Sequence, residues 1–351
     1  MSEAAPDPVL VYRHPGLLGL VLNRPEVINT LNLEMVRRLR RALEKARPAP
    51  DLRLVMLSGA GERGFSAGGD LKPLARAVQA GALAEAARFF QEEYALDLAL
   101  HQYPRAVAAL TDGICLGGGL GLAAGADFII ATERTRMAMP ETRIGFFPDV
   151  GATGWLFGRC PPGYPEFLAL TGWELLGPEC VRVGLATHLV TGARLPELKA
   201  RLEEAVAGLP RRKEEAAAQL KEVIEPLAEP PPPPRTEMDA WVAEHFAGKE
   251  TLAAILDSLG RCRAGLKFCA DVFQRLRERS PTALAVTLRL LRANQARPLA
   301  EVFAREARAA RFMAAHPDYL EGIRARLIHR DDRPRWHPAT LEEVAGEDWD
   351  F

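Results

Sequence analysis

Two glycine-rich segments each follow an apolar run that we predict to be a strand. The first, GFSAGGD at 64–70, follows a predicted strand at 52–57, and the second, CLGGGLGL at 115–122, follows one at 106–111. Because glycine has no Cβ, the backbone amides of such segments can approach a ligand closely. The second segment also opens a predicted helix at 116–125, whose first-turn N–H groups have no intrahelical partner. Both segments are candidates for holding an anion, and tight packing between strand and helix is the alternative interpretation.

A third segment, AMPETRIGFFPDVG at 138–151, contains two carboxylates, Glu141 and Asp149, among apolar residues, glycines and prolines. Removing a carboxyl group from water raises its pKa and prepares it for proton transfer or for attack on a substrate. The alternative is a loop whose two carboxylates only accept hydrogen bonds from backbone amides. The segment alone does not separate these interpretations.

The elements that must position these segments alternate between strands and helices up to about residue 190, which predicts an α/β architecture. Asn32 is the expected N-cap of a helix with apolar residues at helical spacing. The strands are expected at 9–13, 17–22, 52–57, 106–111 and 127–132, and helices at 71–80 and 83–102. A proline run at 229–235 predicts a linker. We therefore expect a core at 1–190, a helical segment with the linker at 191–235, and a helical region at 236–351.

Composition excludes several classes of protein. Lys and Arg number 45 against 46 for Asp and Glu, so the net charge of -1 provides no broad basic field for nucleic acid or an anionic membrane. No apolar stretch reaches the roughly 20 residues that cross a bilayer, and the first residues lack a signal-peptide pattern. The five cysteines form no CxxC pair, so neither a disulfide framework nor a zinc site is indicated. A cytoplasmic location is expected.

The three segments, in this order and spacing, resemble the crotonase (enoyl-CoA hydratase/isomerase) superfamily, as do Asn23-Arg24-Pro25 and Leu31-Asn32. The resemblance implies a spiral of ββα turns that binds acyl-CoA. It also implies that the backbone amides of Gly69 and Gly118 hold the thioester oxygen as negative charge develops on it. The backbone of Ser66-Ala67-Gly68 would lie beside the CoA adenine, and Asp70 and Gly117 complete this part of the predicted substrate-binding set.

Within the superfamily, the pattern MPETxIGxFPDVG is similar to 3-hydroxyisobutyryl-CoA hydrolases, as is the FFQEEY run at 89–94. Hydratases of the superfamily carry a glutamate where this chain has Gly121, so their carboxylate pair is incomplete here. The resemblance implies that Glu141 is the nucleophile or the general base, and that Asp149 binds the substrate hydroxyl or positions the water. Glu93 would line the acyl pocket. No cofactor is expected, because CoA is part of the substrate, and no metal ligands are assigned.

Two other functions stay open at this point. One is another crotonase-fold reaction, either hydration, isomerisation or decarboxylation of an acyl-CoA, since an isomerase can work with a single acid–base group. The other is a non-catalytic acyl-CoA-binding module, although such a module has no need of both Glu141 and Asp149. A homo-oligomer is possible, because crotonase relatives often form trimers or hexamers.

Overall fold

The computed structural model describes residues 6–262, 266–344, 349 and 351. These residues form two compact units, each built from three stretches of chain. Unit 1 comprises the residues up to Gly69 together with Ala95–Met137 and Leu175–Pro233, and unit 2 comprises Asp70–Tyr94, Ala138–Glu174 and Pro234–Phe351. The last of these boundaries falls inside the proline run that we expected to be a linker. The domain boundaries expected at 190 and 235 stay predictions.

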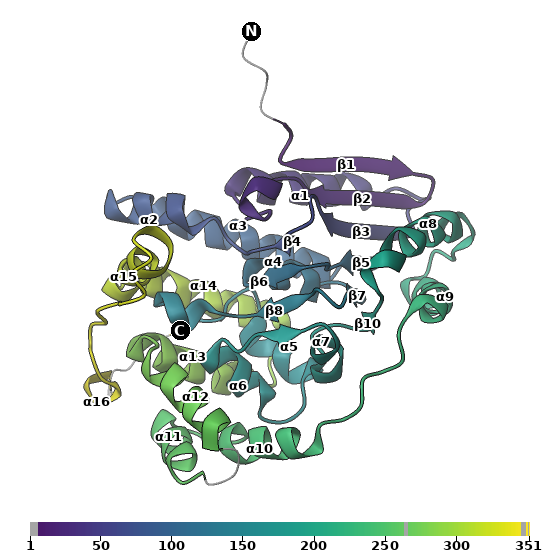
Figure 1. The fold of residues 1–351 in the computed structure, drawn as a ribbon. Helices are drawn as coiled ribbons and strands as arrows, with labels where there is room; N and C mark the ends of the chain where they lie inside the picture. Colours follow the sequence, from purple (N-terminus) through teal and green to yellow (C-terminus); the bar gives the residue numbers. More distant parts are fainter. Residues whose placement is uncertain (1–5, 263–265, 345–348, 350) are drawn as a thin grey trace. The chain divides into compact units, whose positions relative to one another are not determined.

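Unit 1 contains a six-stranded sheet of order β1-β2-β3-β5-β7-β10 (Figure 1). β1 and β2 form an antiparallel hairpin around Gly16, and the other neighbouring strands are parallel. The strands are β1 (Val9–His14), β2 (Leu17–Leu22), β3 (Leu54–Gly59), β5 (Ala106–Leu110), β7 (Phe128–Ala131) and β10 (His188–Leu189). All five predicted strands are confirmed, with β3 beginning two residues later than the apolar run.

A second sheet in unit 1 has the order β4-β6-β8-β9. Its strands are β4 (Gly64–Ser66), β6 (Ile114–Leu116), β8 (Arg136–Ala138) and β9 (Leu175–Leu176). Along the chain, β3, β5 and β7 of the larger sheet are each followed by a short strand of this smaller sheet. Each turn of the chain therefore contributes one strand to each sheet, which is the repeated arrangement that the predicted spiral requires.

The helices of unit 1 bury one face against the sheets. In α1 (Leu33–Ala46), the Asn32 side chain accepts a hydrogen bond from the Met35 amide at 2.9 Å, so the predicted N-cap is confirmed. In α8 (Leu195–Ala205) and α9 (Lys213–Ile224), residues such as Leu202 and Leu220 share one core cluster with Met56 of β3. The remaining α-helices that lie wholly in this unit are α4 (Gly118–Ala124) and α7 (Pro178–Val183).

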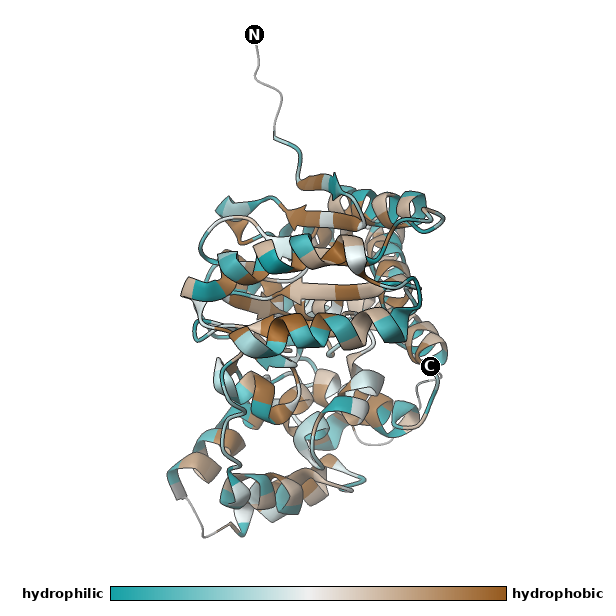
Figure 2. Ribbon diagram, turned by 90° about the vertical axis from the view of Figure 1, so that its right-hand side faces the viewer, coloured by the Kyte–Doolittle hydropathy of each residue, from teal (hydrophilic) through white to brown (hydrophobic). Residues whose placement is uncertain are grey.

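Unit 2 is helical, and it contains the helical region that was expected at 236–351. Its helices are α2 (Leu71–Gln79), α5 (Ala152–Arg159), α6 (Tyr164–Thr171), α10 (Thr236–Phe246), α11 (Leu252–Gly260), α12 (Leu266–Arg277), α13 (Pro281–Asn294), α14 (Leu299–Ala315), α15 (Pro317–Ile323) and α16 (Leu341–Val344). The residues of α3 (Leu83–His101) are divided between the units after Tyr94. Figure 2 shows hydrophilic and hydrophobic residues on different sides of the helices. Among the described residues, no helix is both long and apolar enough to cross a membrane.

A disulfide in unit 2 corrects one sequence expectation. Cys262 and Cys269, seven residues apart, are joined through their sulfur atoms. The cysteine spacing indicated no disulfide framework, and for this pair that interpretation is wrong. The pairing depends on how the end of α11 packs beside α12, which the spacing of cysteines along the chain does not reveal.

Candidate active site

The two glycine-rich segments of unit 1 lie side by side because they leave neighbouring parallel strands. β4 pairs with β6, with Gly64 opposite Ile114 and Ser66 opposite Cys115. The carboxyl ends of parallel strands meet at the same edge of a sheet, so both loops begin at one edge. The sequence predicted each loop separately, and the strand pairing brings them together.

Glycine is required at position 68 because the two loops touch there. Gly68 has a φ of +92°, and a Cβ on it would lie 3.0 Å from the Leu116 carbonyl oxygen and 3.3 Å from the Gly118 nitrogen. A Cβ on Gly119 would lie 2.7 Å from the Ser66 Cβ. Gly118 is the first residue of α4, where N–H groups have no intrahelical partner. The amides predicted to bind an oxyanion therefore lie in two closely packed loops of the same unit.

The first loop is held by hydrogen bonds to the chain before α1. The Ser66 hydroxyl donates to the Asn29 carbonyl at 2.9 Å and accepts from the Gly68 amide at 3.2 Å. The Ala67 amide donates to the Ile28 carbonyl at 2.9 Å, and the Gly68 carbonyl accepts from the Leu31 amide at 2.8 Å. These bonds occupy the Ser66 side chain and the Ala67 amide. Any contact of this segment with CoA would thus use its other backbone groups.

Unit 2 brings together the three carboxylates that the sequence singled out. Glu93 lies on α3, Glu141 begins the 3₁₀ helix Glu141–Ile144, and Asp149 lies in the loop before α5. Their exposed fractions are 2%, 8% and 6%, respectively. The Tyr94 hydroxyl donates to Asp149 Oδ2 at 2.7 Å. The spacing of Glu141 and Asp149 suggested one site, and the structure adds Tyr94 to it.

Burial raises the pKa of every carboxyl in this group. For Glu93 and Glu141, desolvation is the larger cause, and the negative charge of Asp149 raises their pKa further. Desolvation also raises the pKa of Asp149 to about 7, although the Tyr94 hydrogen bond opposes this shift by stabilising the ionised form. The rise in pKa that loss of water predicts is present, and repulsion between the carboxylates contributes less to it. A carboxyl whose pKa lies near 7, such as Asp149, can exchange protons near neutral pH, as acid–base catalysts must.

A cluster of packed aromatic rings includes Tyr94, which hydrogen-bonds Asp149. Phe146 stacks on Phe90 with ring centroids 5.1 Å apart and on Phe147 at 4.8 Å. The Tyr319 ring lies 5.5 Å from that of Phe146. Phe90 and Tyr94 belong to the FFQEEY run, so that run supplies both a buried carboxylate and part of the apolar wall beside it.

Several buried polar atoms at this site have no hydrogen-bond partner among the residues that the structure describes. They are Glu93 Oε1, Glu141 Oε2 and the Tyr319 hydroxyl. A buried polar atom left unpaired costs about 1–3 kcal/mol, so proteins rarely keep several together without a use for them. A substrate hydroxyl group or a water molecule has the chemistry to satisfy these atoms.

Glu306 of α14 holds the loop that carries Asp149. Its carboxylate accepts hydrogen bonds from the Gly151 amide at 2.6 Å, the Thr153 amide at 3.1 Å and the Thr153 hydroxyl at 2.6 Å. Burial raises the pKa of Glu306 to about 8. Glu306 could not be recognised from the sequence, because it lies more than 150 residues from its partners and no local motif marks it. Tyr94 and Tyr319 were also missed, although Tyr94 directly follows Glu93.

The raised carboxyl pKa values predict how stability depends on pH. A carboxyl whose pKa is higher in the folded state binds protons more tightly there, so its presence lowers stability as pH rises above its unfolded pKa. Glu93→Gln should therefore raise the melting temperature by a few degrees at pH 8 and have little effect at pH 4. Thermal unfolding at both values measures the difference. Glu92→Gln, which removes a half-buried partner of Arg88 on the same helix, is the control. Equal effects of Glu93→Gln at both values would contradict the interpretation.

Comparison with known proteins supplies the class. A family model described as enoyl-CoA hydratase/isomerase matches residues 18–351. The chain therefore belongs to the enoyl-CoA hydratase/isomerase family, whose reactions act on CoA thioesters. The resemblance to the crotonase superfamily and the α/β fold class are confirmed.

Several proteins similar to this chain fall within a smaller part of this family. The mitochondrial 3-hydroxyisobutyryl-CoA hydrolase of Gallus gallus is 35% identical, over 99% of this chain and 88% of its own length. The same enzyme of Homo sapiens is 36% identical over the same shares. Among solved structures, a carnitinyl-CoA dehydratase from Mycobacterium thermoresistibile has a TM-score of 0.86 at 33% identity, covering 97% of this chain and 94% of that one. An enoyl-CoA hydratase from Rhodobacter sphaeroides 2.4.1 has a TM-score of 0.85 at 31% identity, covering 97% and 95%.

The predicted site residues thus fall into two groups. Ser66, Ala67, Gly68, Gly69, Gly117 and Gly118 lie in the adjacent loops of unit 1, and Glu93, Glu141 and Asp149 lie in unit 2. Asp70 is the N-cap residue of α2 and the first residue of unit 2. Their roles in binding and catalysis stay predictions.

Proposed function

We propose that this enzyme hydrolyses a short β-hydroxyacyl-CoA thioester, with 3-hydroxyisobutyryl-CoA as its substrate, to the free acid and CoA. The observation that carries the proposal is the buried group of Glu93, Glu141 and Asp149, with raised pKa values and unpaired oxygens. The hydrolases named above, which resemble this chain over nearly its full length, support the substrate.

In the proposed mechanism, the amides of Gly69 and Gly118 donate hydrogen bonds to the thioester oxygen. Fixed donors stabilise the negative charge that develops on this oxygen, without the reorganisation that water would need. Glu141 either attacks the carbonyl carbon or takes a proton from an attacking water. In the first case, the C–S bond breaks to release CoA, and water then hydrolyses the mixed anhydride. In the second, the acid and CoA form in one addition–elimination sequence.

Asp149 and Glu93 have a different role in the proposal. They accept hydrogen bonds from the β-hydroxyl group of the substrate or from the water. Tyr94 orients Asp149 through its hydrogen bond, and Glu306 holds the following turn. The negative charges of Asp149 and Glu93 also raise the pKa of Glu141, because they disfavour its ionised form.

A second candidate is the addition of water to an enoyl-CoA or its reverse. Two solved structures with TM-scores of 0.86 and 0.85 carry the names of a dehydratase and a hydratase, which favours this candidate. Gly121 argues against this candidate, because the hydratases that this chain resembles carry a glutamate at that position.

One pair of assays separates the candidates. The protein is incubated with 3-hydroxyisobutyryl-CoA and with crotonyl-CoA, while thiol release and the loss of enoyl absorbance are followed separately. Thiol release from the first substrate alone is the expected result. Loss of enoyl absorbance without thiol release would establish the hydratase. If neither signal is seen, the result favours a non-catalytic acyl-CoA-binding module.

The coupling between carboxylates predicts a pH effect. Asp149→Asn removes a charge that raises the pKa of Glu141, while an amide oxygen remains to accept from Tyr94. The rising acid limb of the kcat/KM profile should therefore move to lower pH, in addition to any loss of rate. Profiles of the wild type and of the exposed control Glu222→Gln provide the reference. A limb that stays in place or moves upward in Asp149→Asn contradicts Glu141 as the group that must be ionised.

A further inference from the structure

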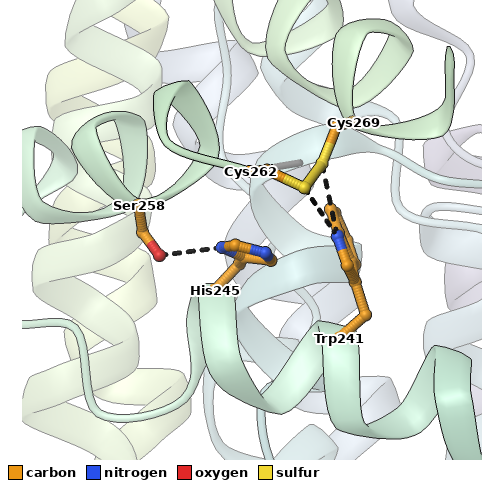
Figure 3. The surroundings of a disulfide bond; sticks show 5 residues. All are labelled: Trp241, His245, Ser258, Cys262 and Cys269. Atoms are coloured by element: carbon orange, nitrogen blue, oxygen red, sulfur yellow. Dashed lines mark hydrogen bonds between the residues drawn. A yellow bond between two sulfur atoms is a disulfide. The ribbon is translucent and has the colours of Figure 1, made fainter. Parts of the chain in front are cut away.

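Three helices of unit 2 bring together two cysteines and a histidine outside the candidate active site. Figure 3 shows His245 of α10 beside Cys262, which follows α11, and Cys269 of α12. The two sulfur atoms and an imidazole nitrogen of His245 all lie within 4.8 Å of one another. His245 and Cys269 are 4% and 5% exposed. Among the described residues, this is the one group of three or more potential metal ligands at such distances.

Two neighbouring side chains orient these groups as the outer shell of a metal site does. The Ser258 hydroxyl of α11 lies 2.8 Å from His245 Nδ1, and Figure 3 shows the other ring nitrogen on the side away from Ser258. In metal sites, a hydrogen bond to one nitrogen of a ligating histidine sets the direction of the other. The Trp241 indole N–H lies 3.3 Å from both sulfur atoms and donates to them. Such a donor stabilises thiolates as well as a disulfide.

The ligand chemistry selects a thiophilic divalent ion. Two thiolates and one neutral imidazole suit Zn²⁺, which binds Cys and His in tetrahedral sites and accepts water as a fourth ligand. Ligand atoms in such a site stand about 3.5–3.8 Å apart, as follows from Zn–S and Zn–N bond lengths. The Cα atoms of Cys262 and Cys269 are 6.6 Å apart, a span that two cysteine side chains bridge around one ion.

We propose that His245, Cys262 and Cys269 form a redox-gated binding site for Zn²⁺. In the oxidised state the cysteines are joined to each other, as in this structure. A thiol or phosphine reductant supplies two electrons, and with two protons the disulfide becomes two thiols. Zn²⁺ then binds both sulfurs and the imidazole, and the two thiol protons are released. The disulfide and the metal exclude each other, because coordination requires thiolates.

The disulfide joins the end of α11 to α12, and a bound Zn²⁺ would join α10 to them through His245 as well. The region is therefore cross-linked in reducing as well as oxidising conditions. The inference is independent of the proposed hydrolase activity, because none of the three residues belongs to the predicted active site. Spacing alone did not reveal the site, since Cys262 and Cys269 form no CxxC pattern and His245 lies 17 residues before Cys262.

Cobalt substitution tests the site in the full chain. The protein is reduced with a phosphine, freed of metal and titrated with Co²⁺, whose thiolate charge-transfer and tetrahedral ligand-field bands report coordination by sulfur. We expect saturation at one equivalent, displacement by Zn²⁺, and no bands in the oxidised protein. Cys269→Ser should abolish the thiolate band at one equivalent, and Cys160→Ser, at a cysteine outside this group, should retain it.

Ser258→Ala separates a metal site from a purely structural disulfide. The variant keeps both cysteines and the histidine, but it loses the hydrogen bond to His245 Nδ1. Loss of such an outer-shell partner lowers metal affinity by about 10–100-fold. Weaker Co²⁺ binding in Ser258→Ala, with disulfide formation unchanged, supports the proposal. It is overturned if the reduced wild type shows no stoichiometric thiolate–cobalt band, or if Cys269→Ser binds Co²⁺ as the wild type does.

Discussion

Glu141→Gln should lower kcat for thioester hydrolysis by at least about 10³, because the variant can neither attack the carbonyl nor accept a proton from water. Glutamine preserves the size of the side chain, so the buried site should stay packed. Binding of the CoA ester should change by no more than a few-fold. Steady-state kinetics and calorimetric titration measure the two quantities. Glu222→Gln, at an exposed position of α9, is the control. A Glu141→Gln variant with unchanged kcat would remove Glu141 from the mechanism.

A trapping experiment separates the two roles of Glu141. If Glu141 is the nucleophile, hydroxylamine added during turnover converts the mixed anhydride to a hydroxamate on that side chain. Mass spectrometry of the peptide containing residue 141 detects the product. If Glu141 is a general base, the peptide stays unmodified while turnover continues.

Gly68→Ala should lower kcat by about 10²–10³, the cost of losing one oxyanion donor. The new Cβ would lie 3.0 Å from the Leu116 carbonyl oxygen and 3.3 Å from the Gly118 nitrogen, at a φ of +92°. A methyl group there forces the two glycine-rich loops apart and misdirects the amides of Gly69 and Gly118.

The control for this effect is Gly208→Ala, in the same unit, where an added Cβ meets no atom within 4 Å. That variant should retain wild-type kcat. Circular dichroism and thermal unfolding establish that both variants fold. If a folded Gly68→Ala variant hydrolyses the substrate at the wild-type rate, the amides of these loops do not stabilise the transition state.

The local elements of this chain could be predicted because their signals are local. Asn32 and the apolar residues after it define a helix start, and the structure shows the capping bond. The strand positions follow from short apolar runs bounded by glycine and proline. The spiral itself is not a local property, because it depends on successive strands joining different sheets. The spiral could be expected from the sequence only through the resemblance to the crotonase superfamily.

The candidate site was predictable where its residues share a motif. Glu141 and Asp149 lie in one segment, and Glu93 lies in the FFQEEY run. Glu306 was not predictable, because its contacts with Gly151 and Thr153 arise only when α14 packs beside the start of α5. The disulfide between Cys262 and Cys269 was missed for the same reason. In each case the function of a side chain depends on helix packing rather than on neighbours in sequence.

The proposal requires that main-chain amides and buried carboxylates act on the same thioester. A crystal structure of Glu141→Gln with bound 3-hydroxyisobutyryl-CoA measures this directly. We predict that the thioester oxygen lies about 2.7–3.1 Å from the nitrogens of both Gly69 and Gly118, with residue 141 facing the carbonyl carbon. A thioester oxygen that contacts neither amide, or an acyl group remote from residues 93, 141 and 149, would contradict the account.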